Sequence, residues 1–265
     1  MPAWFFMWAL SFSIFAGLKW MTWWKARAHT PHSAGRSVAY LVAWPGMDAE
    51  TFLDADKQPA KPTAPDWLWA ATKTALGAAL LWIVARRVPE DQNLLRGWIG
   101  LLGLIFVLHF GSFHLIALFW QTMGIYAEPI MSKPILSKTL SEFWSKRWNL
   151  GFRQLAHEFI FRPLHKRTGV AVAGLLVFAA SGLIHDLVIS LPARGGYGLP
   201  TGYFVIQGLG VTLERSALGR MLRLQRGPIA WIFMIIVTAA PAFWLFHPPF
   251  VLRVILPFMR AIHAL

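Results

Sequence analysis

One histidine of the chain lies where ionisable residues are rare. His185 ends an apolar run that begins at Val170. An ionisable side chain within a membrane span is a candidate functional group by default, and neutral imidazole is the commonest general base near neutral pH. The alternative is a histidine that packs against a neighbouring helix, and the run alone leaves both open. Asp186 points about 100° away on a helix, so we do not expect it to orient the imidazole.

Asn149 lies in a second segment that could contribute to chemistry. Counted along a helix from Trp144, the aromatic and leucine side chains fall on one face and the polar ones on the other. The aromatic face comprises Trp144, Trp148, Phe152, Leu155 and Phe159, and the polar face Glu142, Lys146, Asn149, Arg153 and His157. The pattern predicts an interfacial amphipathic helix over residues 138–161, with Ser137 as its cap and Pro163 at its end. Asn149 is either a hydrogen-bond donor to substrate or part of a solvated face.

Other polar residues indicate no metal or cofactor site. His109 and His114 lie five residues apart in one apolar run and predict buried polar contacts. His29 and His32 have no acidic third ligand nearby, and Glu214 is expected at the membrane interface. The chain has no cysteine, which excludes disulfides and cysteine-bound zinc. We expect no metal and no cofactor beyond a co-substrate.

The composition is that of a membrane protein. The 265 residues are 56% hydrophobic and only 14% charged, with 15 Trp and 20 Phe. Soluble domains contain roughly 25% charged residues, and aromatic side chains favour the bilayer interface. These numbers exclude an ordinary soluble enzyme and a disordered chain. They predict an all-α, polytopic integral membrane protein that forms a single domain over residues 1–265.

The apolar runs predict six membrane spans and leave a seventh open. The expected spans are residues 3–24, 67–84, 97–122, 170–191, 198–213 and 229–246, the last bent at Pro241. Residues 249–263 carry Arg253 and Pro257 and could span, re-enter or lie flat. In the fourth span Ala171, Gly174, Ser181 and Gly182 form a small-residue stripe with His185, which predicts that this face packs against protein.

Basic residues predict the orientation of these spans. Three loops on one side carry 17 Lys and Arg, whereas the opposite side carries four. Basic loops face the cytoplasm, so we expect loops 25–66 and 123–169 to be cytoplasmic. This topology also accounts for most of the net charge of +13 without nucleic acid as a partner. Lys19 and Lys73 are expected to snorkel towards the basic side.

Two motifs in order carry a resemblance to a known family. The segment LSEFWSKRWNLGFRQLAHEFIFRPL (140–164) contains F-W-x-x-R-W-N, and FAASGLIHDLVISLP (178–192) contains S-G-x-x-H. Together they resemble the wax-synthase-like branch of the membrane-bound O-acyltransferase family. GGYGLPTGYFVIQGLGVTLER (195–215) and LVAWPGMD (41–48) look like regions of its bacterial members.

The resemblance implies transfer of an acyl group from an acyl thioester, such as acyl-CoA, to the hydroxyl of a lipophilic alcohol, giving a neutral ester such as a wax ester. It implies that His185 is the general base and that Asn149 orients substrate or stabilises negative charge. Neighbours on the two motif segments are expected to line the substrate site: Trp144, Arg147, Trp148, Arg153 and Ser181. Lys146 and Arg167 are expected near the phosphates of acyl-CoA.

The residue types leave two other functions open. The intramembrane histidines could line the path of a transporter or channel, or the chain could be a catalytically inactive membrane partner. A transporter would move a substrate across the membrane without forming a covalent product. An inactive partner would neither transport a substrate nor form a product. The chain is short for the family, and Asp186 stands where the plant-like pattern has glutamate. Acyl length, acceptor and oligomeric state are not encoded in one-dimensional patterns.

Overall fold

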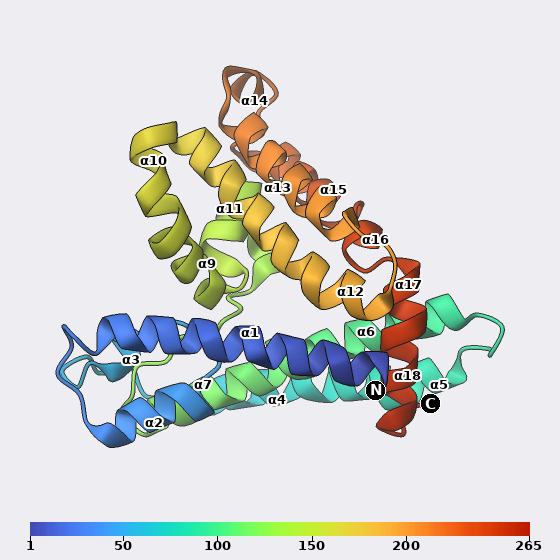
Figure 1. Ribbon diagram of the computed structural model, residues 1–265, viewed down its shortest axis with the longest axis horizontal. Coiled ribbons are helices and arrows are strands. Elements are labelled where there is room, and N and C mark those ends of the chain that lie inside the picture. Colours follow the sequence, from blue (N-terminus) through green and yellow to red (C-terminus); the bar gives the residue numbers. More distant parts are fainter. The chain divides into compact units, whose positions relative to one another are not determined.

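The computed structural model describes all residues 1–265, and every regular element in it is helical (Figure 1). Five helical stretches are long and apolar enough to cross a membrane, which confirms the all-α polytopic fold. They are α1 (Ala3–Ala26), α4 to α5 (Ala64–Arg87), α6 to α7 (Asn93–Thr122), α11 to α12 (Val170–Ala193) and α15 to α16 (Gly227–Leu245).

The expected span 198–213 differs from the other five. It forms the 17-residue helix α13 (Leu199–Arg215), which is too short to count among them. Gln207 and Glu214 of this helix are buried in protein, so its sequence reflects protein packing as much as lipid. The C-terminal tail is also helical, with α17 (Pro248–Phe250), η7 (Val251–Ile255) and α18 (Leu256–Ala261), and is not among the five either.

Three of the long stretches change from α-helix to a π-helical turn and back. The first joins α4 (Ala64–Ala79) through η1 (Leu80–Val84) to α5 (Ala85–Arg87). The second joins α6 (Asn93–Ile105) through η2 (Phe106–Ser112) to α7 (Phe113–Thr122). The third joins α11 (Val170–His185) through η6 (Asp186–Ser190) to α12 (Leu191–Ala193). The last stretch instead breaks between α15 (Gly227–Ala239) and α16 (Ala242–Leu245), where Pro241 cannot continue the helical hydrogen bonds, as predicted.

The chain folds into two compact units. One comprises residues 1–7, 132–149 and 155–257, and the other residues 8–131, 150–154 and 258–265. Both predicted motifs, apart from residues 150–154, fall in the first unit. That the whole chain forms a single domain stays a prediction.

The first unit is built around two long helices, α11 and α13, which lie side by side (Figure 1). Gly182 permits this approach, because a Cβ there would lie 2.6 Å from Thr201 Cα. Further along, a Cβ on Gly208 would lie 3.0 Å from the Phe178 ring. The small-residue stripe therefore faces protein at Ser181 and Gly182, as predicted, whereas Ala171 at its other end is exposed.

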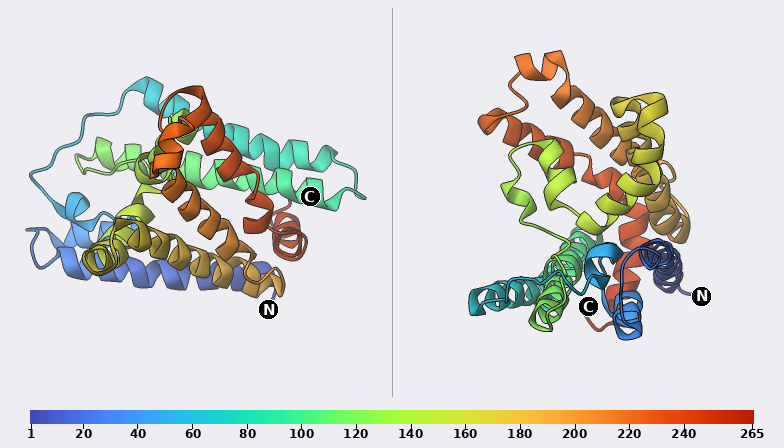
Figure 2. Two further views of the ribbon diagram at one scale, coloured as in Figure 1. Left: turned by 90° about the horizontal axis from the view of Figure 1, so that it is seen from above. Right: turned by 90° about the vertical axis from the view of Figure 1, so that its left-hand side faces the viewer.

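The second unit pairs α4 with the α6–α7 stretch, which run alongside each other in Figure 2. Glycines again set the distance, since a Cβ on Gly77 would lie 2.6 Å from Val107 N and one on Gly111 would meet Thr74. The loop after α1 is ordered rather than open. Its helices α2 (Ala34–Ala43) and α3 (Ala49–Leu53) bury Tyr40, Trp44 and Phe52 in a hydrophobic cluster.

The prediction that Lys19 snorkels is wrong. Its side chain is 1% exposed, donates a hydrogen bond from Nζ to Gly46 O and lies 3.1 Å from the Tyr40 ring centroid. The carbonyl and the aromatic face replace water around the ammonium group. Lys73 has a different partner, because its Nζ lies 2.8 Å from His114 Nδ1.

The two histidines of the third span differ from each other. His114 makes the predicted polar contact, with Lys73. His109 does not, because its buried Nδ1 has no hydrogen-bond partner and its ring packs at 5.4 Å against Phe113.

The predicted interfacial helix over 138–161 is not continuous. It begins with α8 (Leu140–Glu142), capped by Thr139 rather than Ser137, and continues into η4 (Phe143–Arg147). An extended Trp148 and a left-handed Asn149 interrupt it before α9 (Leu150–Ala156) and η5 (His157–Phe161). Pro163 does not end the segment, since α10 (Arg162–Thr168) continues directly from η5 with helical backbone at Phe161 and Arg162.

Candidate active site

His185 is held in one tautomer at the last position of α11. Its Nδ1 lies 2.7 Å from the carbonyl oxygen of Ser181, one turn earlier. A carbonyl oxygen only accepts, so Nδ1 carries the proton and Nε2 keeps its lone pair. No hydrogen bond in the structure engages Nε2, and the ring packs at 4.4 Å against Phe204 of α13. The predicted base therefore has the protonation pattern that proton abstraction requires.

A continuous series of aromatic rings links the two motifs within the first unit. Trp148 stacks on Phe143 at 5.3 Å, and Phe143 meets Trp144 edge-on at 5.1 Å. Trp144 lies 5.8 Å from Phe204, the ring that contacts His185. The structure thus brings the predicted Trp144, Trp148, Ser181 and His185 into one connected apolar region. Such a lining suits a lipophilic substrate better than a charged one.

Gln207 fixes one of these rings and was not predicted. Its side chain is 0% exposed, and its Oε1 accepts from Trp144 Nε1 at 3.3 Å. Its Nε2 donates to Val237 O at 2.7 Å. A buried amide with both ends bonded sets the plane of the indole. The sequence offers one signal for this residue, a glutamine within an otherwise apolar run. Such a glutamine commonly makes a structural contact, so the signal does not single it out as functional.

Asn149 occupies a backbone position that few residues adopt. Its φ is 43°, in the left-handed region, where asparagine is several-fold enriched among non-glycine residues. A backbone hydrogen bond lies close to it in sequence, in which Ser132 N donates to Arg147 O at 2.8 Å. The residue therefore has a structural reason to be asparagine in addition to the predicted chemical one.

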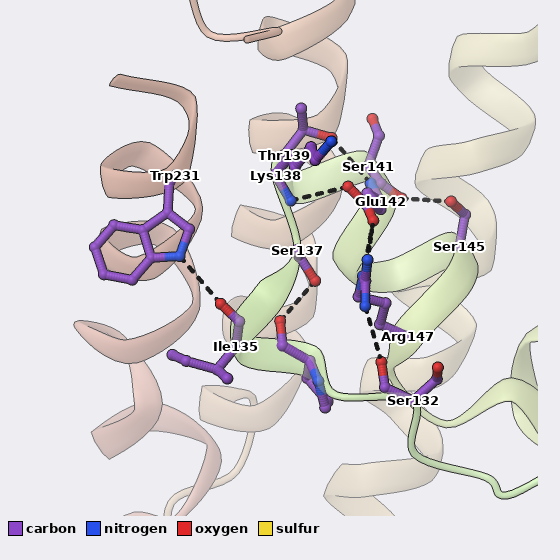
Figure 3. Close-up of polar contacts among 11 residues, drawn as sticks. Ser132, Ile135, Ser137, Lys138, Thr139, Ser141, Glu142, Ser145, Arg147 and Trp231 are labelled. Atoms are coloured by element: carbon purple, nitrogen blue, oxygen red, sulfur yellow. Dashed lines mark hydrogen bonds and ion pairs between the residues drawn. The ribbon is translucent and has the colours of Figure 1, made fainter. Parts of the chain in front are cut away.

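Arg147 has a carboxylate partner of its own. Its Nε and Nη2 each lie 2.7 Å from Glu142 Oε1, and Lys138 N donates to the other oxygen at 2.9 Å (Figure 3). Burial alone would raise the pKa of Glu142. The Lys138 N–H and the Arg147 guanidinium outweigh it and hold that pKa below its usual value. Arg147 thus braces the turn that carries Trp144 and Trp148.

The remaining basic residues of the prediction lie on the surface. Lys146, Arg153 and Arg167 are exposed, on η4, α9 and α10 respectively. Their exposure leaves them accessible to a charged ligand. No three His, Asp or Glu side chains lie close enough together to hold a metal ion.

Asp186 has a role that the sequence did not reveal. Its Oδ1 accepts from Ser190 Oγ at 2.8 Å and Gly198 N at 2.9 Å, and its Oδ2 accepts from both Thr201 N and Thr201 Oγ1. It does not bond to His185, as expected. Instead it joins the end of α11 to the start of α13, the helix that carries Phe204. The signal that could have found it is a carboxylate within an apolar span, which needs a full set of donors.

His247 completes the same cluster from a third helix end. It is 0% exposed, its Nδ1 accepts from Phe250 N at 3.2 Å, and its Nε2 lies 3.2 Å from Ser190 Oγ. Nδ1 is therefore the acceptor, and the Nε2 proton points to Ser190. Serine, histidine and aspartate meet here, but the aspartate bonds to the serine and not to the histidine. This order differs from that of a nucleophilic triad.

Glu214, which was expected at the membrane interface, is buried in protein. It is 3% exposed, and its Oε2 accepts from Leu140 N at 2.7 Å and Ser141 N at 3.2 Å. The N–H groups at the start of α8 have no partner within the helix, so a carboxylate is favourable there. Glu214 thereby fastens the segment with the first motif to the end of α13.

Comparisons with known proteins point to the same family as the motifs. Residues 127–206 match the model of the "Membrane bound O-acyl transferase family". A long-chain-alcohol O-fatty-acyltransferase of Simmondsia chinensis is 29% identical over 49% of this chain and 40% of its own length. An acyl-CoA–sterol O-acyltransferase of Arabidopsis thaliana is 26% identical over 46% of this chain and 39% of its own.

The chain spans about two fifths of the length of these relatives. The family-model match over residues 127–206 includes Asn149, His185 and the aromatic series between them. A probable long-chain-alcohol O-fatty-acyltransferase of Arabidopsis thaliana, 29% identical over 50% of this chain, covers a similar share, 41%, of its own length. The resemblance drawn from the two motifs is confirmed, because residues 127–206 match the model of this family and the chain is similar to long-chain-alcohol O-fatty-acyltransferases.

Proposed function

We propose that the protein transfers an acyl group from an acyl thioester, acyl-CoA in the first instance, to the hydroxyl of a lipophilic alcohol. The observation that carries this is His185, whose Nδ1 proton is committed to Ser181 O while Nε2 keeps its lone pair. The family match and the names of the relatives, which include long-chain-alcohol and sterol acyltransferases, support the same reaction.

In the proposed mechanism His185 Nε2 removes the hydroxyl proton as the alcohol oxygen attacks the thioester carbonyl. The carbonyl oxygen gains negative charge, and the Asn149 amide stabilises it or orients the substrate. The C–S bond then breaks, the ester leaves, and the thiolate takes the proton from His185. The products are one ester and one thiol, so the reaction needs no cofactor beyond its co-substrate.

The aromatic series is the proposed lining of the alcohol site. Ser181 O accepts from His185, Trp148 directly precedes Asn149, and Trp144 packs against Phe204, the ring that contacts His185. Arg147 and Arg153 are the polar candidates for substrate contact, and Lys146 and Arg167 for the phosphates of CoA. Support for these four is their charge and their position in residues 123–169, the loop that carries Asn149.

We also propose that loops 25–66 and 123–169 face the cytoplasm of a bacterial cell, with the spans in its inner membrane. The support is the excess of basic residues in these loops and the resemblance of residues 41–48 and 195–215 to bacterial members. Accessibility of single cysteines to an impermeant reagent tests the orientation. The chain has no native cysteine to interfere.

The reaction is tested with purified protein, labelled acyl-CoA and a panel of fatty alcohol, sterol, diacylglycerol and short alcohols. We expect a labelled ester, and a fall of roughly 10²- to 10⁴-fold in His185→Ala. His165→Ala is the matched control, because His165 Nδ1 also bonds a carbonyl one turn earlier, Arg162 O at 2.9 Å, but on the exposed α10. Ester formation that survives in His185→Ala would exclude this base.

Asn149 needs a pair of variants because its backbone is left-handed. Asn149→Gly removes the amide and keeps the φ angle accessible, whereas Asn149→Ala also adds backbone strain. If the amide acts in chemistry, both variants lose ester formation and Asn149→Gly retains stability. If Asn149 serves only the turn, Asn149→Gly keeps its activity. Transport of substrate without a labelled product, by wild type, would contradict the proposed function itself.

A further inference from the structure

The turn between α13 and α15 concentrates positive charge and exposed apolar side chains. It includes α14 (Ala217–Met221), drawn at the junction of these helices in Figure 1. Residues 215–226 contain four arginines and no acidic residue. Three large apolar side chains are exposed between them: Leu218 at 49%, Met221 at 73% and Leu222 at 47%.

Two of the arginines line a pocket of about 420 Å³ together with Gly227, Pro228 and Ile229. Arg223 and Arg226 are exposed, and no hydrogen bond or ion pair engages either guanidinium. The other two arginines of the turn are occupied. Arg215 Nε donates to Ser141 Oγ at 3.1 Å, and Arg220 Nη1 donates to Arg215 O at 3.4 Å.

The backbone holds the pocket in place. Arg223 has a φ of 58°, and Leu224 N on its C-terminal side donates to Gly219 O at 2.8 Å, which closes the end of α14. The short turn then leads directly into α15 at Gly227. The two guanidinium groups therefore project from a fixed turn and not from a long loop.

The place of this turn in the chain points to its ligand. α15 begins one of the five stretches that can cross a membrane, so the pocket lies where that stretch enters the bilayer. Lipid phosphates lie at this depth, and arginine binds phosphate in a bidentate manner. Leu218, Met221 and Leu222 have the character of side chains that enter the headgroup region.

We propose that the pocket of Arg223 and Arg226 binds the phosphate of an anionic phospholipid headgroup and fixes the turn to the membrane surface. A free phosphate would meet only the two guanidinium groups. A phospholipid would in addition place its acyl chains along Ile229 and the apolar side chains of the turn. The proposal does not depend on the acyl-transfer reaction.

The test measures binding of dioctanoyl phosphatidylglycerol to the full chain in a neutral detergent. We expect saturable binding that weakens as salt rises from 50 to 500 mM, with dioctanoyl phosphatidylcholine binding far more weakly. Arg223→Gln with Arg226→Gln should weaken binding about twentyfold, since an arginine near an anionic surface contributes about fivefold. Arg87→Gln with Arg260→Gln removes two exposed arginines elsewhere and should change it less than twofold.

Three results would overturn the proposal. The first is equal binding of phosphatidylglycerol to wild type and to Arg223→Gln with Arg226→Gln, when the latter melts at the wild-type temperature. The second is equal binding of the two lipids. The third is that coenzyme A or inorganic phosphate, and not the lipid, loses affinity in the pocket variant, which would assign the pocket to a soluble phosphate. Arg223→Lys with Arg226→Lys, which keeps the charge, should restore most of the binding.

Discussion

Asp186 offers a graded test of how the site is held. Its four hydrogen bonds divide evenly between the two carboxylate oxygens, with Ser190 and Gly198 on Oδ1 and Thr201 on Oδ2. Asp186→Asn keeps one oxygen, so the first pair of bonds can persist. Its amide nitrogen would then face the Thr201 N–H, donor against donor, and that bond is lost, whereas Thr201 Oγ1 can accept from the amide. Asp186→Ala loses all four.

The expected magnitudes follow from this division. A net contribution of about 1 kcal/mol per hydrogen bond, at a site that water partly reaches, gives a loss of about 1 kcal/mol for Asp186→Asn and about 4 kcal/mol for Asp186→Ala. In a chain of this size 1 kcal/mol lowers the melting temperature by roughly 2–4 °C. We therefore expect decreases of about 2–4 °C and about 8–16 °C.

The assay is thermal unfolding in detergent, followed by ester formation below the melting temperature. Both variants should form ester more slowly, because the bonds of Asp186 set the register of the helix that carries Phe204 against His185. Asp91→Asn, the same change at an exposed aspartate, should leave both quantities unchanged. Equal melting temperatures for Asp186→Asn and Asp186→Ala, or values within 1 °C of wild type for both, would refute the division of bonds.

Three further predictions concern packing, pH and a buried amide. Gly182→Val should abolish folding or activity, because a Cβ would lie 2.6 Å from Thr201 Cα; Gly174→Ala, with nothing within 4 Å of its Cβ, should melt at or above the wild-type temperature. Glu142 has a lowered pKa, so its contribution to stability is complete above the ordinary glutamate pKa of about 4.3 and is lost as the pH falls through the lower folded-state value. Glu142→Gln should flatten the fall in melting temperature across that acid range, and an unchanged slope would contradict the assignment. Gln207→Leu should destabilise the protein by about 1–3 kcal/mol, measured by thermal unfolding, because two partly buried groups, Trp144 Nε1 and Val237 O, lose their hydrogen bonds.

Apolar length and motif order predicted the parts of the molecule that depend on local chemistry. Long apolar runs form helices in any case, because lipid leaves no other partner for the backbone. His185 at the end of such a run is therefore placed by the sequence alone. Its tautomer also follows locally, since the carbonyl one turn earlier belongs to the same helix.

Contacts between distant segments were beyond the sequence pattern. Lys19 contacts Gly46 and Tyr40 because the loop after α1 folds back onto that helix. Hydrophobic periodicity does not predict the conformation of such a loop. Glu214 is buried because α8 presents its first N–H groups there, 74 residues away along the chain. In both cases a charged residue, of a type usually found at the surface, is buried because another element provides its hydrogen-bond partner.

The amphipathic pattern around Asn149 was correct about faces and wrong about continuity. A helical wheel assumes one fixed rotation per residue, and a π turn followed by a left-handed residue violates that assumption twice. Phe143 and Trp148 still stack, because the break brings rings together that a straight helix would space differently.

The π turn η6, immediately after His185, also affects how this chain is compared with others. A π turn is closed by an i→i+5 hydrogen bond instead of i→i+4, so it contains one residue more than an α turn. It commonly corresponds to a single-residue insertion. A relative with an uninterrupted α-helix here would align correctly only with a one-residue gap between His185 and Leu191. Without that gap, the helical positions that follow the turn, Leu191–Ala193, would be matched to residues on a different side of the helix. Substitution patterns at Asp186 and Ser190 then become interpretable only from alignments that place the gap by structure.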